Sequence, residues 1–198
     1  SSLFFGLQMF IKDYLLTPFT QADIDAAEVT IEGHGLPFNR AGWESMLKKH
    51  HGFLPLSISA VKEGSVIPLH QVLCQVVNTD PEFFWLTNYI ETAILRAIWY
   101  PTTVATISFH TKTLLKTYLE ETADTLGSLP FKLHDFGGRG ASSLETAMLG
   151  GIAHLVNFMG TDTLPAISAA KQFYHEDMAG FSIPAAEHST ITSWGREH

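Results

Sequence analysis

Residues 132–140 read KLHDFGGRG, and this stretch decides how the second half of the chain is interpreted. The stretch begins like a strand and continues into a turn with three glycines. Its polar and aromatic residues are His134, Asp135, Phe136 and Arg139. Glycine permits positive φ angles and lets a ligand approach the backbone closely. An aromatic face beside a guanidinium suits a flat ring that carries, or is joined to, an anion. A purely structural turn needs one glycine and no crowd of ionisable groups, so the stretch predicts a binding turn.

Two later stretches repeat this order of apolar run, polar loop and helix. The apolar residues 153–158 lead into a loop at 160–163, and a helix is predicted over 164–174. The run 181–186 leads into the polar residues 187–190, after which another helix is predicted to begin. The sequence therefore predicts three successive strand–loop–helix units.

One polar residue in each unit follows the predicted strand. These residues are Arg139, Asp162 and His188, which lie roughly 25 residues apart. This period is typical of parallel sheets and barrels, in which catalytic groups collect at the carboxyl ends of strands. We therefore predict that a guanidinium, a carboxylate and an imidazole face one pocket.

The first half of the chain has a different pattern. Apolar residues at helical spacing predict an amphipathic helix over 3–15, and Thr20 and Asn39 are predicted to cap the next two helices. Residues 56–61 alternate as a half-buried strand does, and residues 72–77 are its predicted partner. These elements are typical of an α+β arrangement.

The two patterns predict an α/β fold with an α+β N-terminal part. Pro101 is expected to open a helix that runs to about residue 122, and β/α alternation begins near Leu129. Residues 1–100 are assigned to a portion of an α+β domain. Residues 101–198 are assigned to the first β/α units of an incomplete barrel.

Composition and charge exclude several classes of function. The chain is 45% hydrophobic and 12% aromatic, which is typical of a globular protein. Its net charge of −8, without a basic run, argues against nucleic acid as a partner. The lone Cys74 lies in an apolar stretch and is expected to be a buried small hydrophobe in a reducing compartment. No apolar run approaches the roughly 18 residues that a membrane span needs, so no membrane partner is expected.

Three stretches make a resemblance to a known family specific. They read KLHDFGGRG (132–140), HLVNFMGTDT (154–163) and IPAAEHSTITSWG (183–195). In these stretches the chain resembles the nicotinamide phosphoribosyltransferases, type II phosphoribosyltransferases that make nicotinamide mononucleotide in NAD salvage. Further matching stretches upstream extend the resemblance through nearly all of the chain.

The resemblance implies an architecture and a reaction. It implies an irregular α/β barrel packed on an α+β domain, in a cytoplasmic homodimer whose subunits share the active site. Family members are much longer than 198 residues, so the chain is expected to be an internal fragment that is inactive alone. Nicotinamide would attack C1 of phosphoribosyl pyrophosphate and pyrophosphate would leave, with Mg²⁺ carried by the diphosphate and ATP as a coupled co-substrate.

The resemblance also implies roles for individual residues. Phe136 would be the platform for the nicotinamide ring, whose other face a tyrosine of the partner subunit would cover. Asp162 would accept a hydrogen bond from the carboxamide and repel the carboxylate of nicotinate. Arg139 would clamp the diphosphate. His188, oriented by Glu187, would contact the diphosphate and be phosphorylated by ATP.

Ser182 and His134 are further candidates for lining the pocket. The remaining histidines show no HExxH or HxH spacing, so no transition-metal site built by the protein is expected. The chain departs from the family at Gly138, where animal-type members commonly carry tyrosine. This glycine is expected to widen the mouth of the pocket.

Each candidate residue has an ordinary structural alternative. Phe136 could be a core residue and Arg139 a surface ion-pair former. Asp162 and His188 could cap helices, and His134 could be a buried hydrogen-bond partner. The alternatives for function are a nicotinate phosphoribosyltransferase, a non-catalytic interaction domain of the same fold, and an unrelated barrel enzyme acting on a phosphate substrate.

Overall fold

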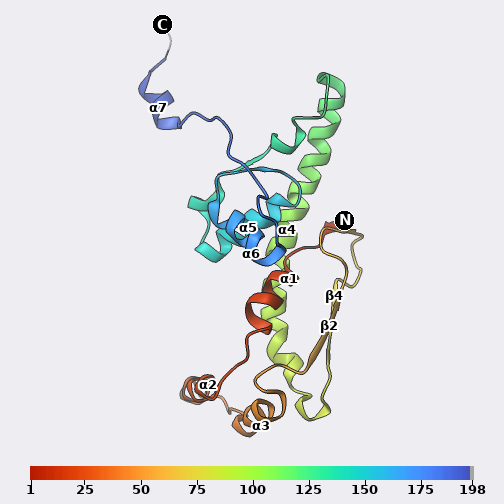
Figure 1. Cartoon of the computed structure of the whole chain (residues 1–198), viewed down its shortest axis with the longest axis vertical. Helices are drawn as coiled ribbons and strands as arrows, with labels where there is room; N and C mark the ends of the chain where they lie inside the picture. Colours follow the sequence, from red (N-terminus) through yellow and green to blue (C-terminus); the bar gives the residue numbers. More distant parts are fainter. Residues whose placement is uncertain (197–198) are drawn as a thin grey trace. The chain divides into compact units, whose positions relative to one another are not determined.

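The computed structural model describes residues 1–196 of the chain (Figure 1). It has mixed α/β structure, with many helices and three small two-stranded sheets in the described part. The mixed α/β class is therefore confirmed, while the barrel stays a prediction. The chain divides into two compact units, Ser1–Phe109 and His110–His198. The assignment of residues 1–100 and 101–198 to two domains of the family stays a prediction.

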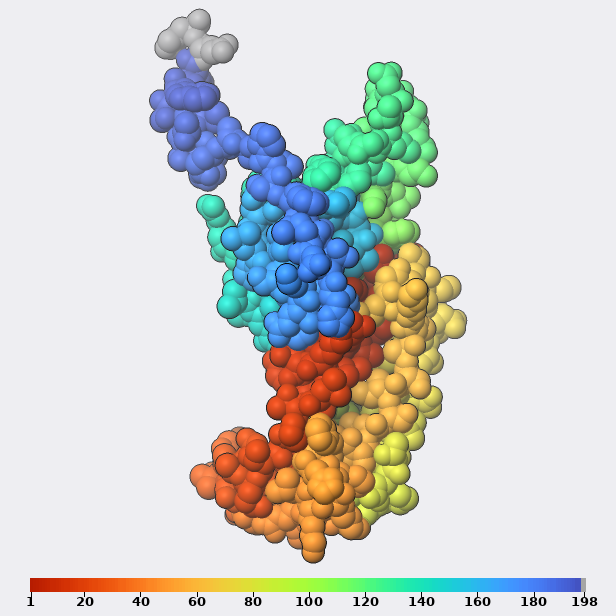
Figure 2. Space-filling model, viewed as in Figure 1, coloured from red at the N-terminus to blue at the C-terminus, as the bar shows by residue number. Residues whose placement is uncertain are grey.

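Two antiparallel pairs of strands form the sheets of the first unit. Strand β2 (Leu56–Ala60) pairs with β4 (Cys74–Asn78), which confirms the predicted pair. Strand β1 (Ser2–Leu3) pairs with β3 (Val66–Ile67), so the N-terminal residues join the hairpin region. Figure 2 shows this contact between the N-terminal segment, in red, and the hairpin, in yellow and orange. Burial raises the pKa of the Cys74 thiol, which suits an unreactive packing residue.

The helix predicted over 3–15 is confirmed from Leu7 onward and is wrong for the first residues. The structure has a short helix α1 (Leu7–Phe10) followed by a π-helical turn, η1 (Ile11–Leu15). Leu3 is in a strand, and its N–H donates to the hydroxyl of Thr106 at 2.8 Å. These long-range partners hold the first residues extended, although their apolar spacing is helical.

The next two helices begin where the sequence predicts. Helix α2 (Gln21–Gly33) starts with a capping box, in which the Thr20 hydroxyl accepts from the N–H of Asp23 and the carboxylate of Asp23 accepts from the N–H of Thr20. The side chain of Asn39 accepts from the backbone at the start of α3 (Arg40–His50). Both predicted caps are confirmed.

Pro101 does not open a helix, as the sequence predicted, but lies inside the long helix α4 (Leu86–Thr122). A proline removes one backbone hydrogen bond and crowds the preceding turn. Here the Pro101 side of the helix packs against the N-terminal segment. Gly6 has a φ of 109°, and a Cβ on it would lie 2.3 Å from Cγ of Pro101. The hydroxyl of Thr102 also accepts from the N–H of Phe5 at 3.2 Å and donates to its carbonyl at 3.1 Å, so packing outweighs the lost bond.

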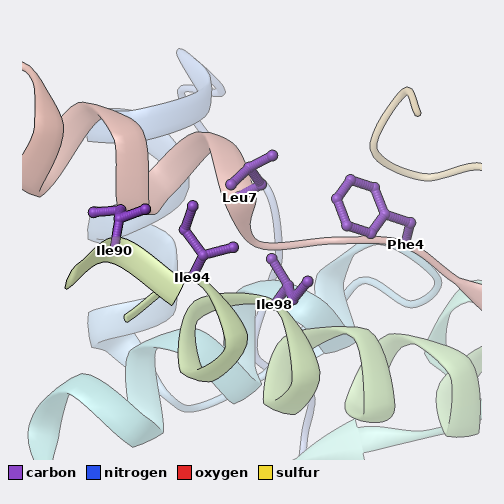
Figure 3. Packing of buried hydrophobic residues seen from close by; sticks show 5 residues of the cluster. All are labelled: Phe4, Leu7, Ile90, Ile94 and Ile98. Atoms are coloured by element: carbon purple, nitrogen blue, oxygen red, sulfur yellow. The ribbon is translucent and has the colours of Figure 1, made fainter. Parts of the chain in front are cut away.

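A core of aliphatic and aromatic side chains lies between α4 and the N-terminal segment (Figure 3). Ile90, Ile94 and Ile98 recur every four residues, which places them on one face of α4. They pack with Phe4 and Leu7, and all five are buried. Burying each such side chain contributes about 1.5–3 kcal/mol. A second cluster includes residues from α3, from the 3₁₀ turn η2 (Pro81–Phe83) and from α4, namely Met46, Phe83 and Leu86.

Short parallel strands organise the second unit. Strand β5 (His134–Asp135) follows the 3₁₀ turn η3 (Leu129–Phe131) and pairs in parallel with β6 (Gly160–Thr161). Phe181 forms a parallel bridge to Gly160 on the other side. Three segments therefore run side by side in one direction, and the residues that follow them lie at a common edge.

A helix follows each of these segments. These helices are α5 (Leu144–Leu155), α6 (Leu164–Tyr174) and α7 (His188–Ser193), and a 3₁₀ turn, η4 (Gly137–Gly140), precedes α5. The predicted strand at 153–158 is wrong, because its first residues form the last turn of α5. Apolar residues that are buried on all sides give the same pattern in a helix as in a parallel strand. The predicted helix at 164–174 is confirmed.

Helices α5 and α6 pack closely at a glycine. A Cβ on Gly151 would lie 2.4 Å from the Cβ of Ala166 and 3.2 Å from a carboxylate oxygen of Asp135. The glycine thus allows the two helices and β5 to pack closely, next to the edge at which the parallel segments end. Within residues 1–196, no helix combines the length and the apolar character needed to cross a membrane.

Candidate functional site

A cavity of about 740 Å³ lies where the three parallel segments end. Phe136 and Arg139 reach it from the residues after β5, and Asp162 reaches it from the residue after β6. Glu187 and His188 reach it from the start of α7, which follows an extended segment after Phe181 (Figure 1). The three residues expected to converge therefore line one cavity, and their chemical roles stay predictions.

The carboxylate of Asp162 is held at both oxygens. Ser182 donates its hydroxyl to Oδ1 at 2.7 Å, and Nε2 of His134 lies 2.8 Å from Oδ2. An ionised carboxylate only accepts hydrogen bonds, so this imidazole nitrogen carries its hydrogen. The hydrogen bond from Ser182, and then that from His134, lower the pKa of Asp162. The side chain is 40% exposed, so a fixed negative charge remains accessible to a ligand.

The alternative role of Asp162 as a helix cap is wrong. Thr163 occupies the N-cap position of α6, and neither side chain caps the helix. The backbone N–H of Asp162 donates instead to the carbonyl of Asp135 at 2.9 Å, which ties the loop after β6 to the neighbouring strand. The carboxylate is therefore available for the cavity.

The ring of Phe136 is not a core side chain, so that alternative is also wrong. It is 56% exposed. Its centroid lies 4.3 Å from the ring centroid of His134, at an interplanar angle of 37°. His134 supports the aromatic ring and holds Asp162 at the same time. An exposed aromatic face beside a fixed carboxylate can receive a flat heteroaromatic amide.

The cavity lining also includes an imidazole and a carboxylate from the start of α7. Nε2 of His188 lies 2.9 Å from Oε1 of Glu187, and the two side chains are 81% and 52% exposed. Glu187 is the N-cap of α7, so the alternative that His188 caps this helix is wrong. The N–H of Ser189 is the largest cause that lowers the pKa of Glu187, and the charge of Arg139 is a smaller one. Exposed ion pairs stabilise a fold little, so the imidazole of His188 remains accessible to a ligand.

Sequence interpretation missed Thr163. It is only 4% exposed, lines the cavity, and its hydroxyl oxygen has no hydrogen-bond partner in the described part of the chain. The residue was visible in the sequence as part of a polar loop before a helix. Its burial and its missing partner depend on the packing of α5 and α6, which that pattern does not reveal.

A metal centre is not formed by the side chains that the structure describes. Among residues 1–196, no group of three or more His, Cys, Asp or Glu side chains is placed to hold a metal ion. The cavity combines instead an aromatic ring, a carboxylate, a guanidinium and an imidazole. Together these groups suit a flat amide and an anion bound next to each other.

Comparison with known proteins shows that the chain is similar to phosphoribosyltransferases. Residues 131–198 match the profile of the nicotinate phosphoribosyltransferase (NAPRTase) family. Over 98% of its length the chain is 55% identical to a nicotinamide phosphoribosyltransferase of Xanthomonas campestris pv. campestris, and over 99% it is 36% identical to one of Acinetobacter baylyi. A nicotinamide phosphoribosyltransferase of Mycoplasma pneumoniae is 37% identical over 77% of the chain and 32% of that relative.

The chain spans 42% and 41% of the length of the first two relatives. The predicted resemblance of the whole chain to nicotinamide phosphoribosyltransferases is confirmed, and residues 131–198 are similar to the nicotinate phosphoribosyltransferase family.

Proposed function

We propose that the protein carrying this chain transfers the phosphoribosyl group of phosphoribosyl pyrophosphate to nicotinamide. The products are nicotinamide mononucleotide and pyrophosphate, a step of NAD salvage. The observation that carries the proposal is the carboxylate of Asp162, which is held by Ser182 and His134 beside the exposed ring of Phe136. The names of the relatives support the same substrate.

The reaction replaces one bond at C1 of the ribose. The pyridine nitrogen of nicotinamide forms a bond to C1 while the bond from C1 to the diphosphate oxygen breaks. Positive charge develops on the sugar and then on the ring nitrogen, and negative charge develops on the leaving diphosphate. Phe136 would hold the ring in line, which lowers the entropic part of the barrier. Arg139 would stabilise the leaving anion.

Asp162 would select the amide over the acid. An ionised carboxylate accepts a hydrogen bond from the carboxamide NH₂ of nicotinamide, whereas nicotinate would place a second negative charge against it. The lowered pKa of Asp162 keeps the group charged near neutral pH, so the repulsion persists there. This charge favours nicotinamide over nicotinate, the substrate after which the family is named.

His188 would couple the reaction to ATP. Its imidazole is exposed, and Nε2 lies beside the carboxylate of Glu187. When Nε2–H donates to Glu187, Nδ1 carries the lone pair that attacks the γ-phosphorus of ATP, and ADP leaves. Before and after this phosphorylation the residue would contact the diphosphate together with Arg139.

Mg²⁺ would arrive with the diphosphate, because phosphate oxygens are ligands that this ion prefers. We also propose a cytoplasmic homodimer, in which an aromatic ring of the second subunit covers the exposed face of Phe136.

The test of the proposed base site is Asp162→Asn in the complete gene product. The amide keeps the shape of the side chain but loses its charge, so kcat/KM for nicotinamide should fall on the order of 10- to 100-fold. Turnover of nicotinate should rise relative to nicotinamide. Asp177→Asn is the matched control, because that carboxylate is exposed and paired with Lys171. An unchanged ratio of the two bases in Asp162→Asn would refute the assignment.

The test of ATP coupling is His188→Ala in the same protein. We expect ATP to lose its stimulating effect while basal phosphoribosyl transfer remains detectable, because the imidazole is the phosphorylated group. His34→Ala, at an exposed position after α2, should keep the stimulation. Loss of basal transfer and stimulation to the same extent would contradict the phosphohistidine role.

A further inference from the structure

The imidazole of His134 uses one ring nitrogen and leaves the other without a partner. Its side chain is 7% exposed, and Nε2 lies 2.8 Å from Oδ2 of Asp162. Nδ1 is buried and has no hydrogen-bond partner in residues 1–196. An ionised carboxylate only accepts hydrogen bonds, so the ring hydrogen is on Nε2. Nδ1 therefore carries a lone pair in a place that solvent does not reach.

Gly160 lies against this nitrogen. A Cβ on Gly160 would lie 2.6 Å from Nδ1 of His134, which is too close for two packed atoms. The φ of Gly160 lies outside the left-handed region, so its backbone does not require glycine. Its carbonyl accepts a hydrogen bond from Nε2 of His154 at 2.9 Å, which fixes this part of β6. The missing side chain at Gly160 thus makes room for the ring of His134.

A second proton on this imidazole would be unfavourable. An N–H at Nδ1 would find no acceptor, and a buried donor without a partner is destabilising, more so when it is charged. The attraction of an imidazolium to Asp162 opposes this effect. For a buried ion pair, however, the loss of hydration commonly offsets the Coulombic attraction, and Asp162 already accepts a hydrogen bond from Ser182. The enclosed Nδ1 therefore favours the neutral ring.

Other ionisable groups lie on the elements around His134. Asp135 is its neighbour in β5, and His154 lies in α5. Burial is the largest cause that lowers the pKa of His154, and the nearby His134 is a smaller one. The charged groups that line the cavity besides Asp162 are Arg139, Glu187 and His188. Because Asp162 is the direct partner of His134, a change in the charge of His134 would act mainly on Asp162.

We propose that His134 sets the base specificity of the site, because it remains a neutral donor to Asp162 and leaves the carboxylate its full negative charge. A neutral partner orients the carboxylate without cancelling its repulsion of nicotinate, whereas an imidazolium would give a pair with no net charge. His134 is a positioning residue, since it acts through Asp162. The inference rests on the proposed function, in which Asp162 meets the carboxamide of nicotinamide.

The experiment compares His134→Gln with the natural protein, both as the complete gene product. The side-chain amide of glutamine can donate to Asp162 as Nε2 does, but it does not titrate. Dissociation constants of nicotinamide and nicotinate are measured by calorimetry from about pH 8 to about pH 5.5, on both sides of the ordinary histidine pKa of about 6.5. The ratio of the two constants is expressed relative to its value at the highest pH. The charge of His188 affects both proteins alike, so the difference between their ratios isolates His134.

We expect the ratios of the two proteins to agree within about threefold at every pH, because the ring of His134 gains no charge. His34→Gln, at an exposed position after α2, is the matched control and should behave like the natural protein. A preference for nicotinamide that falls in acid by over about threefold more in the natural protein than in His134→Gln would reveal an imidazolium and overturn the inference.

Two further variants test the donor and the room that Gly160 leaves. His134→Leu removes the donor, so nicotinamide should bind on the order of tenfold more weakly, and His134→Gln should restore most of this loss. Gly160→Ala would push the ring of His134 away from Asp162 and should also weaken nicotinamide. Gly140→Ala adds its Cβ where no atom lies within 4 Å and should not. Equal affinities of His134→Leu and His134→Gln would overturn the inference as well.

The outcomes separate this inference from the proposed function. If nicotinamide does not bind the natural protein, the proposed function and the inference both fall. If nicotinamide binds and is preferred to nicotinate, but the preference falls in acid through His134, only the inference is overturned.

Discussion

The two compact units differ in what holds them together. In the first unit, five-residue antiparallel strands pair beside a cluster of buried side chains on α4. In the second, the paired strands have two residues each, and hydrogen bonds from His134 and Ser182 converge on the half-exposed Asp162. Apolar burial stabilises the first unit, whereas the second leaves polar groups accessible to a ligand. This difference is expected when one region provides a scaffold and another provides a site.

The largest effect is expected from shortening a core side chain of the first unit. Ile94→Ala should lower the free energy of unfolding by about 2–5 kcal/mol, because it leaves a cavity beneath α4. Urea unfolding measures the change, and hydrogen exchange should show it in β2 and β4. The neighbouring Leu95 is 55% exposed, so Leu95→Ala should stay within about 0.5 kcal/mol. Equal effects of the two variants would show that the cluster is not the core of this unit.

A smaller effect is expected at the close helix contact of the second unit. Gly151→Ala should lower the free energy of unfolding by about 1–3 kcal/mol, because the new Cβ would lie 2.4 Å from that of Ala166. This steric clash outweighs the better helix preference of alanine. The same change at Gly33, which has no atom within 4 Å of its added Cβ in α2, should stabilise by up to about 1 kcal/mol. Thermal unfolding of both variants gives the comparison, and stabilisation by Gly151→Ala would contradict the packing of α5 on α6.

The smallest effect concerns how the stability of the second unit depends on pH in the acid range. The folded pKa of Asp162 lies below its ordinary value of 3.8, first because of Ser182. The resulting stability is present above pH about 4 and is lost as the pH falls through the folded pKa. Ser182→Ala should raise this pKa toward 3.8 and flatten the acid dependence. Carbon NMR titration of the carboxyl measures the shift; Ser189→Ala, which affects Glu187, should leave Asp162 unchanged.

Sequence patterns predicted those features whose causes are local. The capping box of Thr20 and Asp23 spans four residues, so its residue types were sufficient. Other predictions were wrong because packing between residues distant in sequence determines the local structure. Pro101 lies within a helix because the N-terminal segment packs against it. Residues 153–155 form the end of a helix because a buried apolar run has the same pattern in a helix as in a strand.

Within the site, the order of strands and polar residues was sufficient to predict that Arg139, Asp162 and His188 meet. Ser182 and His134 were predicted to line the pocket, but they are not among the residues that line the cavity. They hold Asp162 instead, a role that depends on the register of neighbouring segments. The buried hydroxyl of Thr163 was missed for the same reason. Sequence thus indicated which groups face the cavity, and the structure added which side chains fix them.

The most direct test of the central claim is a crystal structure of the complete gene product with nicotinamide and pyrophosphate bound. The account predicts the pyridine ring on Phe136, the carboxamide nitrogen within hydrogen-bond distance of Asp162, and pyrophosphate oxygens on Arg139 and His188. Density for both ligands in a cavity that none of these four side chains line would contradict it.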